Sequence, residues 1–483
     1  MSIWNIDKEK RNIKRLNSDK SVDILIIGGG LTGLNCAYYL MNKKNVCVVD
    51  ANIIGHGVTL NSTAKINYFQ DTIYTKIIKA TSYDKAVSYL DSQRYATKLL
   101  VDIIKKEKIN CNLEKVSSYV FANTKSQINT LESEVKFLRR NNIEVIEDKI
   151  PLNIKTFKSY YVSDTYVFNP IKYLEGLYKI LTTNKVNIYE NSKVLKIKKE
   201  KGKYICYLDK YKIIANKVIL ATHYPYFILP FMMPLRCSIE KSYMIVSKVD
   251  VNKKITCISA DYPIMSIRYY KNNNDIYKIS LSKSHELGYY PNDAYYFDRV
   301  KKIFKIKDQD IVLEYSNSDI MTPDSMPYIG ELKNNLYIGT GYNTWGMTNS
   351  MLASKIITDD ILGVNNKYKD IFNPNRVTLN TFTKIPVYLY NNTKSYIGSK
   401  LVKNKNWYSS NIKFTNINGD NVGIYKDKKG KEHIVYNKCP HLGCSLIFNE
   451  KEKTWDCPCH SSRFNIDGKC IKGPSNYDIS YKE

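Results

Sequence analysis

The chain has 483 residues, 43% of them hydrophobic, which is enough material for two or three globular cores. No apolar run reaches ~18 residues without a charged or helix-breaking residue, and the first residues lack a hydrophobic signal segment, so we expect a cytoplasmic protein without a membrane span. The net charge of +27 comes from lysines scattered among Asn, Ile and Tyr residues, a pattern that argues against nucleic-acid binding and leaves an acidic protein partner or an anionic substrate as alternatives.

The first informative segment predicts a strand, a glycine turn and a helix. Residues 22–27 are mostly apolar and branched, and a helical apolar pattern then continues to Met41. The next strand, 46–49, ends in Asp50, whose carboxylate can accept a hydrogen bond from a ribose hydroxyl. Three glycines hold the G-x-G-x-x-G positions, which permit a tight turn and close approach of a diphosphate to the helix N-terminus: Gly28, Gly30 and Gly33. Together these features predict dinucleotide binding.

Four later segments have features of a flavin-binding domain. They are the loop 55–65, the strand 193–197, the element 218–223 with His223 in place of a usual glycine, and the stretch 324–348. In this order they resemble the D-amino-acid oxidase and glycine oxidase superfamily. A second G-x-G-x-x-G is absent from the sequence, so a separate NAD(P)H domain is not expected. The resemblance implies bound FAD and these further cofactor-contacting residues: Ser62, Thr63, Val194, Gly341, Gly346, Met347 and Thr348.

The middle of the chain predicts a substrate-binding cap. Its pattern is largely helical over 85–142, and candidate strands follow within 234–314. In the oxidase superfamily such a sheet covers the flavin and holds the substrate. Three residues in or near these segments are therefore catalytic candidates. Arg268 could bind a carboxylate, His285 could polarise or deprotonate a substrate, and Tyr342 lies beside the flavin-facing glycines. A surface ion pair for Arg268 and a hydrogen-bonded strand-end position for His285 are the structural alternatives.

The segment after Gly363 predicts a tether and then a small β domain. Residues 366–405 are rich in Asn at first and then moderately apolar, which indicates a linker with some helix. Two short strands at 422–425 and 433–436, separated by a turn that contains Gly430, predict a hairpin.

Two loops after this hairpin each pair a cysteine with a histidine. Cys439 and His441 are separated by one residue, and Cys457 and His460 follow after a gap of fifteen residues. Two thiolates and two imidazoles match a [2Fe–2S] centre with two cysteines on one iron and two histidines on the other. A tetrahedral zinc site is the alternative, although zinc fingers usually place both cysteines in one arm and both histidines in the other.

These loops and their flanks closely resemble the Rieske family. Ser462 matches a serine that donates to a bridging sulfide, and Gly473-Pro474 matches the loop that closes over the cluster. The resemblance implies a disulfide between Cys444 and Cys459, the remaining cysteines of the two loops. Phe464 stands where high-potential relatives have a hydrogen-bonding tyrosine, so we expect a midpoint potential below the top of the Rieske range.

The complete order resembles a bacterial family of FAD-dependent oxidoreductases with a fused Rieske domain. The expected fold is an α/β (α+β) Rossmann-like FAD domain with an antiparallel-sheet substrate domain, plus a small all-β Rieske [2Fe–2S] domain. The expected boundaries are an N-terminal extension at 1–20, an FAD-binding domain at 21–85, 150–225 and 320–365, a substrate domain at 86–149 and 226–319, a linker at 366–405 and the Rieske domain at 406–483.

The resemblance implies an enzyme that oxidises an amine or amino-acid-like small molecule. Its cluster would relay single electrons to an unknown acceptor protein that docks on the exposed histidine face, and the reverse flow is equally compatible with the sequence. A Rieske oxygenase needs a second iron with two histidines and a carboxylate, and the other histidines, His56, His223, His285 and His433, are too dispersed. A non-catalytic electron carrier or redox sensor remains the alternative, because its cofactors would look the same.

Overall fold

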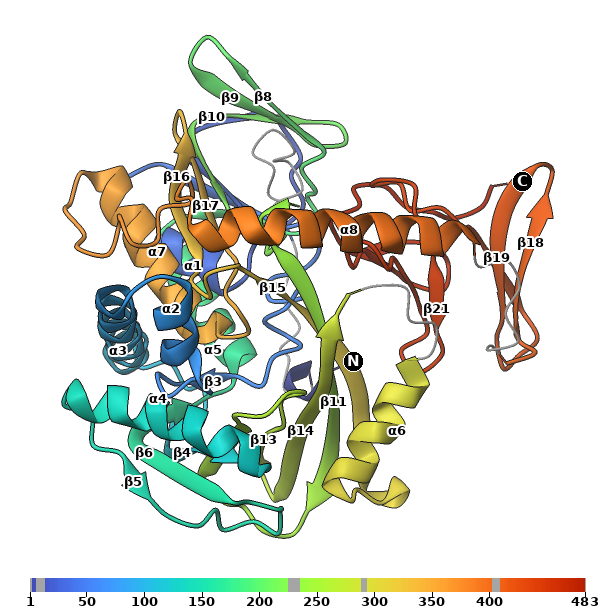
Figure 1. Ribbon diagram of the computed structural model, residues 1–483. Coiled ribbons are helices and arrows are strands. Elements are labelled where there is room, and N and C mark those ends of the chain that lie inside the picture. Colours follow the sequence, from blue (N-terminus) through green and yellow to red (C-terminus); the bar gives the residue numbers. More distant parts are fainter. Residues whose placement is uncertain (1, 6–13, 225–234, 288–292, 402–408, 483) are drawn as a thin grey trace.

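Figure 1 presents a computed structural model of the chain, which describes residues 2–5, 14–224, 235–287, 293–401 and 409–482. Within those residues, none of the helices has the length and apolar character needed to cross a membrane. The chain forms two large sheets that share the first 360 residues, and two small sheets near the C-terminus.

In the described part of the chain, eight strands form the sheet that contains the glycine turn. Its central strand β1 pairs in parallel with β2 on one side and β10 on the other, within the order β16-β17-β10-β1-β2-β7. A parallel strand covered on both faces needs a continuous apolar run, and residues 24–27 are indeed all buried. The strands are β1 (Lys20–Ile27), β2 (Val46–Val49), β7 (Asn187–Tyr189), β8 (Lys196–Glu200), β9 (Lys203–Tyr207), β10 (Lys212–Leu220), β16 (Tyr328–Lys333) and β17 (Leu336–Thr340).

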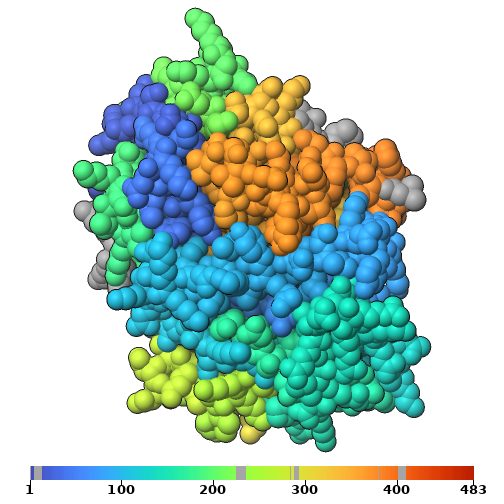
Figure 2. Space-filling view, turned by 90° about the vertical axis from the view of Figure 1, so that its left-hand side faces the viewer, coloured from blue at the N-terminus to red at the C-terminus, as the bar shows by residue number. Residues whose placement is uncertain are grey.

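Three helices accompany this sheet: α1 (Leu31–Leu40), α5 (Pro170–Thr183) and α7 (Gly346–Leu362). Almost every residue of α7 is buried, because the helix packs against α1 and against α3 (Tyr83–Lys106). It ends at Gly363, whose φ of 71° is the left-handed cap that glycine tolerates best. Figure 2 shows the orange segment around α7 beside the light-blue helices of the cap, and the green hairpin β8–β9 projecting from the surface.

The second large sheet is mostly antiparallel and runs in the order β15-β11-β14-β13-β12-β4-β6-β3, with β5 beside β6. The helices α2 (Ile73–Ala80), α4 (Ile128–Arg140) and α6 (Asp293–Phe304) flank it. The strands are β3 (Lys65–Ile66), β4 (Glu114–Ala122), β5 (Ile146–Glu147), β6 (Lys158–Val167), β11 (Ser238–Val249), β12 (Ile255–Ser259), β13 (Ser266–Asn272), β14 (Asp275–Glu286) and β15 (Ile311–Met321).

The C-terminal part begins with α8 (Leu379–Leu401), a long helix that extends from the neighbourhood of β17 to the last domain (Figure 1). Two small antiparallel sheets follow, β18-β19-β20 and β21-β22-β23-β24. The strands are β18 (Ile412–Ile417), β19 (Asp420–Lys426), β20 (Glu432–Tyr436), β21 (Ile447–Asn449), β22 (Thr454–Asp456), β23 (Arg463–Phe464) and β24 (Cys470–Lys472). Their apolar side chains form a core of their own around Trp455.

The predicted fold class is confirmed, but two expected boundaries differ from the sheets. Strand β6 pairs with β4 in the cap sheet, whereas the sequence analysis placed residues from 150 onward in the FAD domain. The expected N-terminal extension is also part of the main core, because Trp4 is fully buried and its indole N–H donates to the Ser62 carbonyl at 2.9 Å. Both differences arise because pairing partners lie far away in the sequence.

Candidate cofactor and substrate sites

A cavity of about 230 Å³ opens where β1, β2 and β10 end, and it is lined by the glycine turn. Gly28 has a φ of 113°, and a side chain there would meet the Ala221 carbonyl oxygen at 2.4 Å. A Cβ on Gly33 would lie 1.9 Å from the Gly28 oxygen, so α1 could not approach β1 as it does. The turn is therefore shaped to leave room for a ligand and to aim the N-terminus of α1 at it.

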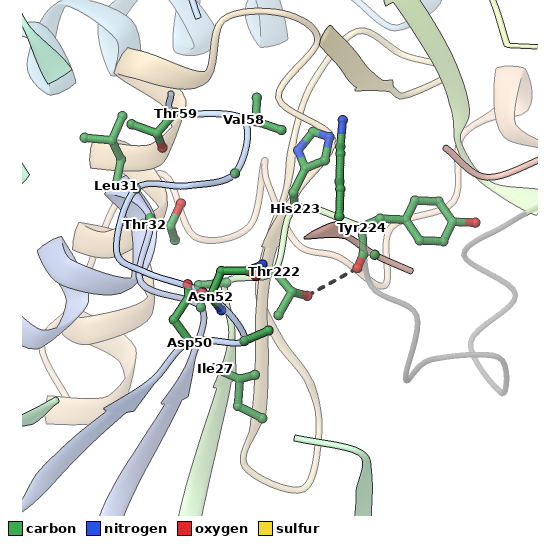
Figure 3. Close-up of a pocket in the computed structure, with 18 of the residues that line it drawn as sticks. Ile27, Leu31, Thr32, Asp50, Asn52, Val58, Thr59, Thr222, His223 and Tyr224 are labelled. Carbon is green, nitrogen blue, oxygen red and sulfur yellow. Dashed lines mark hydrogen bonds between the residues drawn. The ribbon is translucent and has the colours of Figure 1, made fainter. Parts of the chain in front are cut away.

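The acidic residue at the end of β2 occupies the place expected of a ribose acceptor. Asp50 lies beside Asn52 at the edge of the cavity (Figure 3). Its two carboxylate oxygens accept from the backbone N–H groups of Gly29 and Asn52, each at 2.7 Å. Burial raises the pKa of Asp50, and these two hydrogen bonds oppose that shift. Each carboxylate oxygen has a second lone pair, which a ribose hydroxyl can use.

Most of the predicted FAD contacts line this cavity, and the others lie behind its wall or in a neighbouring cavity. Those that line it are Gly28, Gly30, Asp50, Val194, Gly346 and Met347. Gly33 and Gly341 shape the backbone behind the wall, and the Thr348 hydroxyl donates to Gln93 Oε1 at 2.6 Å instead. Ser62 and Thr63 line a second, neighbouring cavity. The fit of the turn, the acid and the helix ends supports FAD in the larger cavity.

The second cavity, of about 100 Å³, adjoins the first and shares Val58, Gly346 and Met347 with it. The cap sheet forms its roof. Glu240 on β11 and Asp319 on β15 are directly opposite each other in the strand register and both line the cavity, so their carboxylates lie on the same face.

The electrostatics of this second cavity are dominated by the acidic pair. Burial raises the pKa of Glu240. Burial also raises the pKa of Asp319 to about 7, where the charge of Lys472 opposes the shift and that of Glu240 adds to it. Asn317 also lines the cavity, and its buried Oδ1 has no hydrogen-bond donor among the described residues. Lys65 is the nearby cation, but its ammonium already donates to the Cys257 carbonyl at 3.0 Å and to Ser266 Oγ at 2.6 Å.

Sequence reasoning missed Glu240 and Asp319, because the sequence around them shows no clean alternation of polar and apolar residues. Lys241 interrupts the alternation at the start of β11, and residues 316–319 of β15 are all polar. Side chains at every second position of a strand share one face, and Glu240 and Asp319 do line the cavity together. The polar residues that share the cavity face are therefore determined by the pairing of the two strands, which the sequence does not show.

The position of Arg268 does not support its predicted role in carboxylate binding. The side chain is 1% exposed and lies over the Trp4 ring. Its guanidinium donates to three backbone carbonyls, those of Thr63, Ala64 and Phe168, at 2.7 to 2.8 Å. These donors are occupied by backbone carbonyls, and Arg268 is not in the lining of either cavity. Arg268 therefore stabilises the loop that precedes β3. The surface ion pair that we considered as the alternative is not found either among the described residues, because the Arg268 side chain is buried.

The other two catalytic candidates also lie away from the second cavity. His285 contacts Tyr243 through Nε2 at 3.1 Å, and its Nδ1–H donates to the Glu286 carbonyl at 2.9 Å. This is the hydrogen-bonded strand-end position that we considered as the alternative. Tyr342 lines the larger cavity, and its hydroxyl bonds to Thr32 Oγ1 at 2.8 Å in the first turn of α1. That contact suits cofactor positioning better than substrate chemistry.

The two Cys–His loops are brought together as an iron–sulfur site requires. Cys439 and Cys457 are buried, and the rings of His441 and His460 lie 4.9 Å apart. The Nδ1 atoms of both histidines are buried without a hydrogen-bond partner in the described residues, so each is available to a metal. Cys444 and Cys459 form the expected disulfide, with a Cα–Cα distance of 6.6 Å. Two thiols and two free ring nitrogens fit a [2Fe–2S] cluster.

One of the two histidines of this site faces the rest of the protein, so the expected docking face is exposed only in part. His441 is partly exposed, and Leu442 beside it is 47% exposed. His460 is 6% exposed, and its ring lies 5.9 Å from that of Tyr224. The next residue, Ser461, shares a hydrogen bond of 2.7 Å with Ser318 on β15. The Ser318 carbonyl in turn accepts from His223 Nε2 at 2.9 Å, and His223 points into the FAD cavity (Figure 3).

Buried charges join the same two regions. Lys241 on β11 pairs with Asp293 at 2.6 Å and with Asp456 of the C-terminal domain at 3.3 Å. Arg463 pairs with Asp456 at 3.0 Å and with Glu452 at 2.8 Å. A buried network of this kind loses free energy when one partner is removed, so it favours a single docked arrangement of the C-terminal domain.

Comparison with known families accounts for nearly the whole chain. Residues 23–360 match the family model described as FAD dependent oxidoreductase, and residues 400–481 match the Rieske [2Fe-2S] domain. The second match identifies the Cys–His loops as an iron–sulfur site rather than the alternative zinc site.

Two relatives and one solved structure are similar to the chain over different shares of its length. The chain is 27% identical over 488 residues to the Rieske 2Fe-2S iron-sulfur protein YhfW of Bacillus subtilis (strain 168), covering 98% of this chain and 96% of that one. It is 23% identical to gamma-glutamylputrescine oxidoreductase of Escherichia coli (strain K12), over 72% of this chain and 85% of that one. Glycine oxidase from Geobacillus kaustophilus has the same fold over 74% of this chain and 99% of its own, with a TM-score of 0.61 and 16% identity.

Proposed function

Because the chain belongs to the FAD dependent oxidoreductase family and ends in a Rieske domain, we propose that it dehydrogenates a cationic amine and passes the electrons between flavin and cluster one at a time. FAD supplies a two-electron acceptor for a C–H bond next to nitrogen, and the [2Fe–2S] cluster takes up single electrons. The protein is thus an oxidoreductase, and the proposal concerns its substrate and the route of its electrons.

The observation that most supports an amine is the charge of the smaller cavity. Glu240 and Asp319 offer carboxylates at the place where a substrate would meet the flavin end of the larger cavity. Arginine, which would receive the carboxylate of an amino acid in two-point fashion, is missing from that lining among the described residues, since Arg268 is occupied elsewhere. The two carboxylates outnumber Lys65, the lysine of the lining, so an ammonium group complements this cavity better than an α-carboxylate does.

The same pair can manage the substrate proton. An amine binds as an ammonium ion but must lose one proton before its nitrogen can assist hydride loss from the adjacent carbon. Asp319, whose pKa is raised to about 7 mainly by burial, is poised near neutral pH to accept that proton. Asn317 Oδ1 lies on the same strand face and can accept a second hydrogen bond from the amine.

Electron exchange with the cluster is supported by the position of the C-terminal domain. His460 is buried beside Tyr224 and Ser461 is buried against β15. One hydrogen-bonded series connects Ser461, Ser318 and His223 to the FAD cavity. A single docked arrangement keeps both centres within one protein interior. The relative gamma-glutamylputrescine oxidoreductase, named for an amine-derived substrate, supports the proposed chemistry.

The test is anaerobic mixing of the holoprotein with monoamines, diamines and α-amino acids. We expect amines to bleach the flavin and then to generate the EPR signal of the reduced cluster, while α-amino acids react poorly. Equal reaction with α-amino acids would contradict the amine assignment. Reduction by a protein donor alone, with no amine response, would favour the non-catalytic electron carrier. Flavin bleaching without any cluster signal would contradict the electron route.

A further inference from the structure

The C-terminal domain forms part of the wall of the FAD cavity. Strand β24 and the loop after it contribute Cys470, Ile471, Lys472, Gly473 and Ser475 to the lining. The flavin domain holds this wall in place through three backbone acceptors. Asn52 Nδ2 donates to the Ile471 carbonyl at 3.3 Å, Lys193 Nζ donates to the Ser475 carbonyl at 2.9 Å, and Asn476 Nδ2 donates to the Leu195 carbonyl at 3.3 Å.

One residue of this wall, Lys472, is a partly buried cation without an ion pair or hydrogen bond among the residues that the structure describes. Its neighbours Lys241 and Arg463 are neutralised by Asp456 and other carboxylates. Burial and the charge of Arg463 lower the pKa of Lys472 to about 8, and the carboxylates of Asp319 and Asp456, which lie beyond ion-pair distance, oppose that shift. Because an ammonium group that is withdrawn from water without a direct partner is unfavourable, this position is explained best by an anion that the cavity receives.

Lys472 lies in the part of the lining of the larger cavity that the C-terminal domain contributes. Its positive charge lowers the pKa of His223, after the larger effect of burial, and it also lowers the pKa of Asp319. His223 lines the larger cavity and Asp319 lines the smaller one. The charge of Lys472 therefore acts on groups in both cavities.

We propose that Lys472 is an FAD-binding residue supplied by the Rieske domain, and that its ammonium offsets negative charge on the bound cofactor. FAD presents such charge on its diphosphate and, after reduction, on the flavin ring. The proposal depends on FAD occupying the cavity and is independent of the proposed amine substrate. It makes the C-terminal domain a structural part of the flavin site as well as an electron partner.

The test compares Lys472→Met with Lys472→Arg and with a control, Lys469→Met, which removes an exposed lysine from the same domain. FAD is removed from each full-length protein and titrated back while flavin fluorescence is followed. We expect Lys472→Met to weaken FAD binding by about tenfold, which corresponds to about 1.4 kcal/mol, and Lys472→Arg to retain most of the affinity. The EPR spectrum of the cluster verifies that the domain is folded.

A second measurement separates the two sources of negative charge. If Lys472 faces the diphosphate, oxidised and reduced FAD lose affinity equally and the flavin midpoint potential stays constant. If it faces the flavin ring, reduced FAD loses more affinity and the potential falls in Lys472→Met. The proposal is overturned if the affinity and the potential both match those of Lys469→Met. Should Lys472→Met lose its cluster, Lys472→Gln is judged by the same two measurements, which need no substrate.

Discussion

The two cofactor sites and the substrate cavity are built in different ways. The FAD turn occupies residues 28–33 and the cluster ligands come from two loops within 439–460, so each of these two motifs is contiguous in sequence, although the FAD cavity also takes lining residues from later segments. The substrate cavity takes Lys65 from β3 and the acidic pair Glu240 and Asp319 from β11 and β15, strands that are distant in sequence and share one sheet only in the folded protein. Contiguous sites depend on local backbone geometry, whereas the cavity depends on tertiary register.

Removal of one cluster ligand tests whether the cluster and FAD bind independently of each other. Of the variants considered, it should cause the largest change, the complete loss of one cofactor. In Cys457→Ser we expect complete loss of the Rieske EPR signal, because a hydroxyl does not replace the buried thiolate among the ligands. Flavin absorbance should remain, since the glycine turn and Asp50 are untouched. The measurement is EPR and FAD content on one sample.

Cys470→Ser is the control for the cluster signal, because that thiol is buried in the same domain and is not a ligand. It should keep the cluster signal. Cys206→Ser is the control for FAD content, because Cys206 is also a buried free thiol but does not line the FAD cavity as Cys470 does. Joint loss of flavin and cluster in Cys457→Ser would mean that the two sites fold as one unit, which contradicts the comparison above.

Replacing an acid of the cavity tests the tertiary site. In Asp319→Asn we expect kcat/KM for an amine to fall about 100-fold, or about 2.7 kcal/mol, because a buried ammonium then lacks half of its counter-charge. Glu240→Gln should act in the same direction. Steady-state kinetics with an artificial electron acceptor measure the effect, and Asp308→Asn, an exposed acid after α6, is the control. An unchanged kcat/KM in both cavity variants would place substrate binding elsewhere.

The pH dependence provides a smaller and sharper test of the same residue. Burial raises the pKa of Asp319 to about 7, so the carboxyl group is neutral below that pH and anionic above it. Attraction for an ammonium ion appears only in the anionic form, and kcat/KM should therefore rise as the pH increases through about 7. The rise should be absent in Asp319→Asn. A profile that falls over this range would have the wrong sign for an acidic residue that binds a cation.

The same contrast explains which parts of the site could be predicted. Gly28 and Gly33 were predicted because a strand, a turn and a helix are short-range events, and Cys439 or His460 because metal ligands have fixed spacing. The role of Arg268 was not predicted correctly, because the sequence does not show that three backbone carbonyls surround its guanidinium group. Lys472 was missed because its neighbours belong to a different domain.

The smallest expected effect concerns the contact between the two cofactor regions. Ser318→Ala removes the hydroxyl that bonds to Ser461 beside the cluster ligand, but it leaves the carbonyl that accepts from His223. Loss of one hydrogen bond in the series should slow electron transfer from flavin to cluster by about three- to tenfold. This corresponds to an increase of at most about 1.4 kcal/mol in the activation free energy. Rapid mixing with an amine, followed by flavin absorbance and freeze-quenched EPR, measures this rate.

Ser316→Ala is the matched control for that experiment. Ser316 lies two residues earlier on the same strand and donates to Glu452 of the C-terminal domain, so its loss also weakens the domain contact without touching the residue next to His460. A slower rate in Ser318→Ala alone would assign electron transfer to the Ser461 contact. Equal slowing in both variants would indicate that docking of the domain, rather than this hydrogen-bonded series, determines the rate.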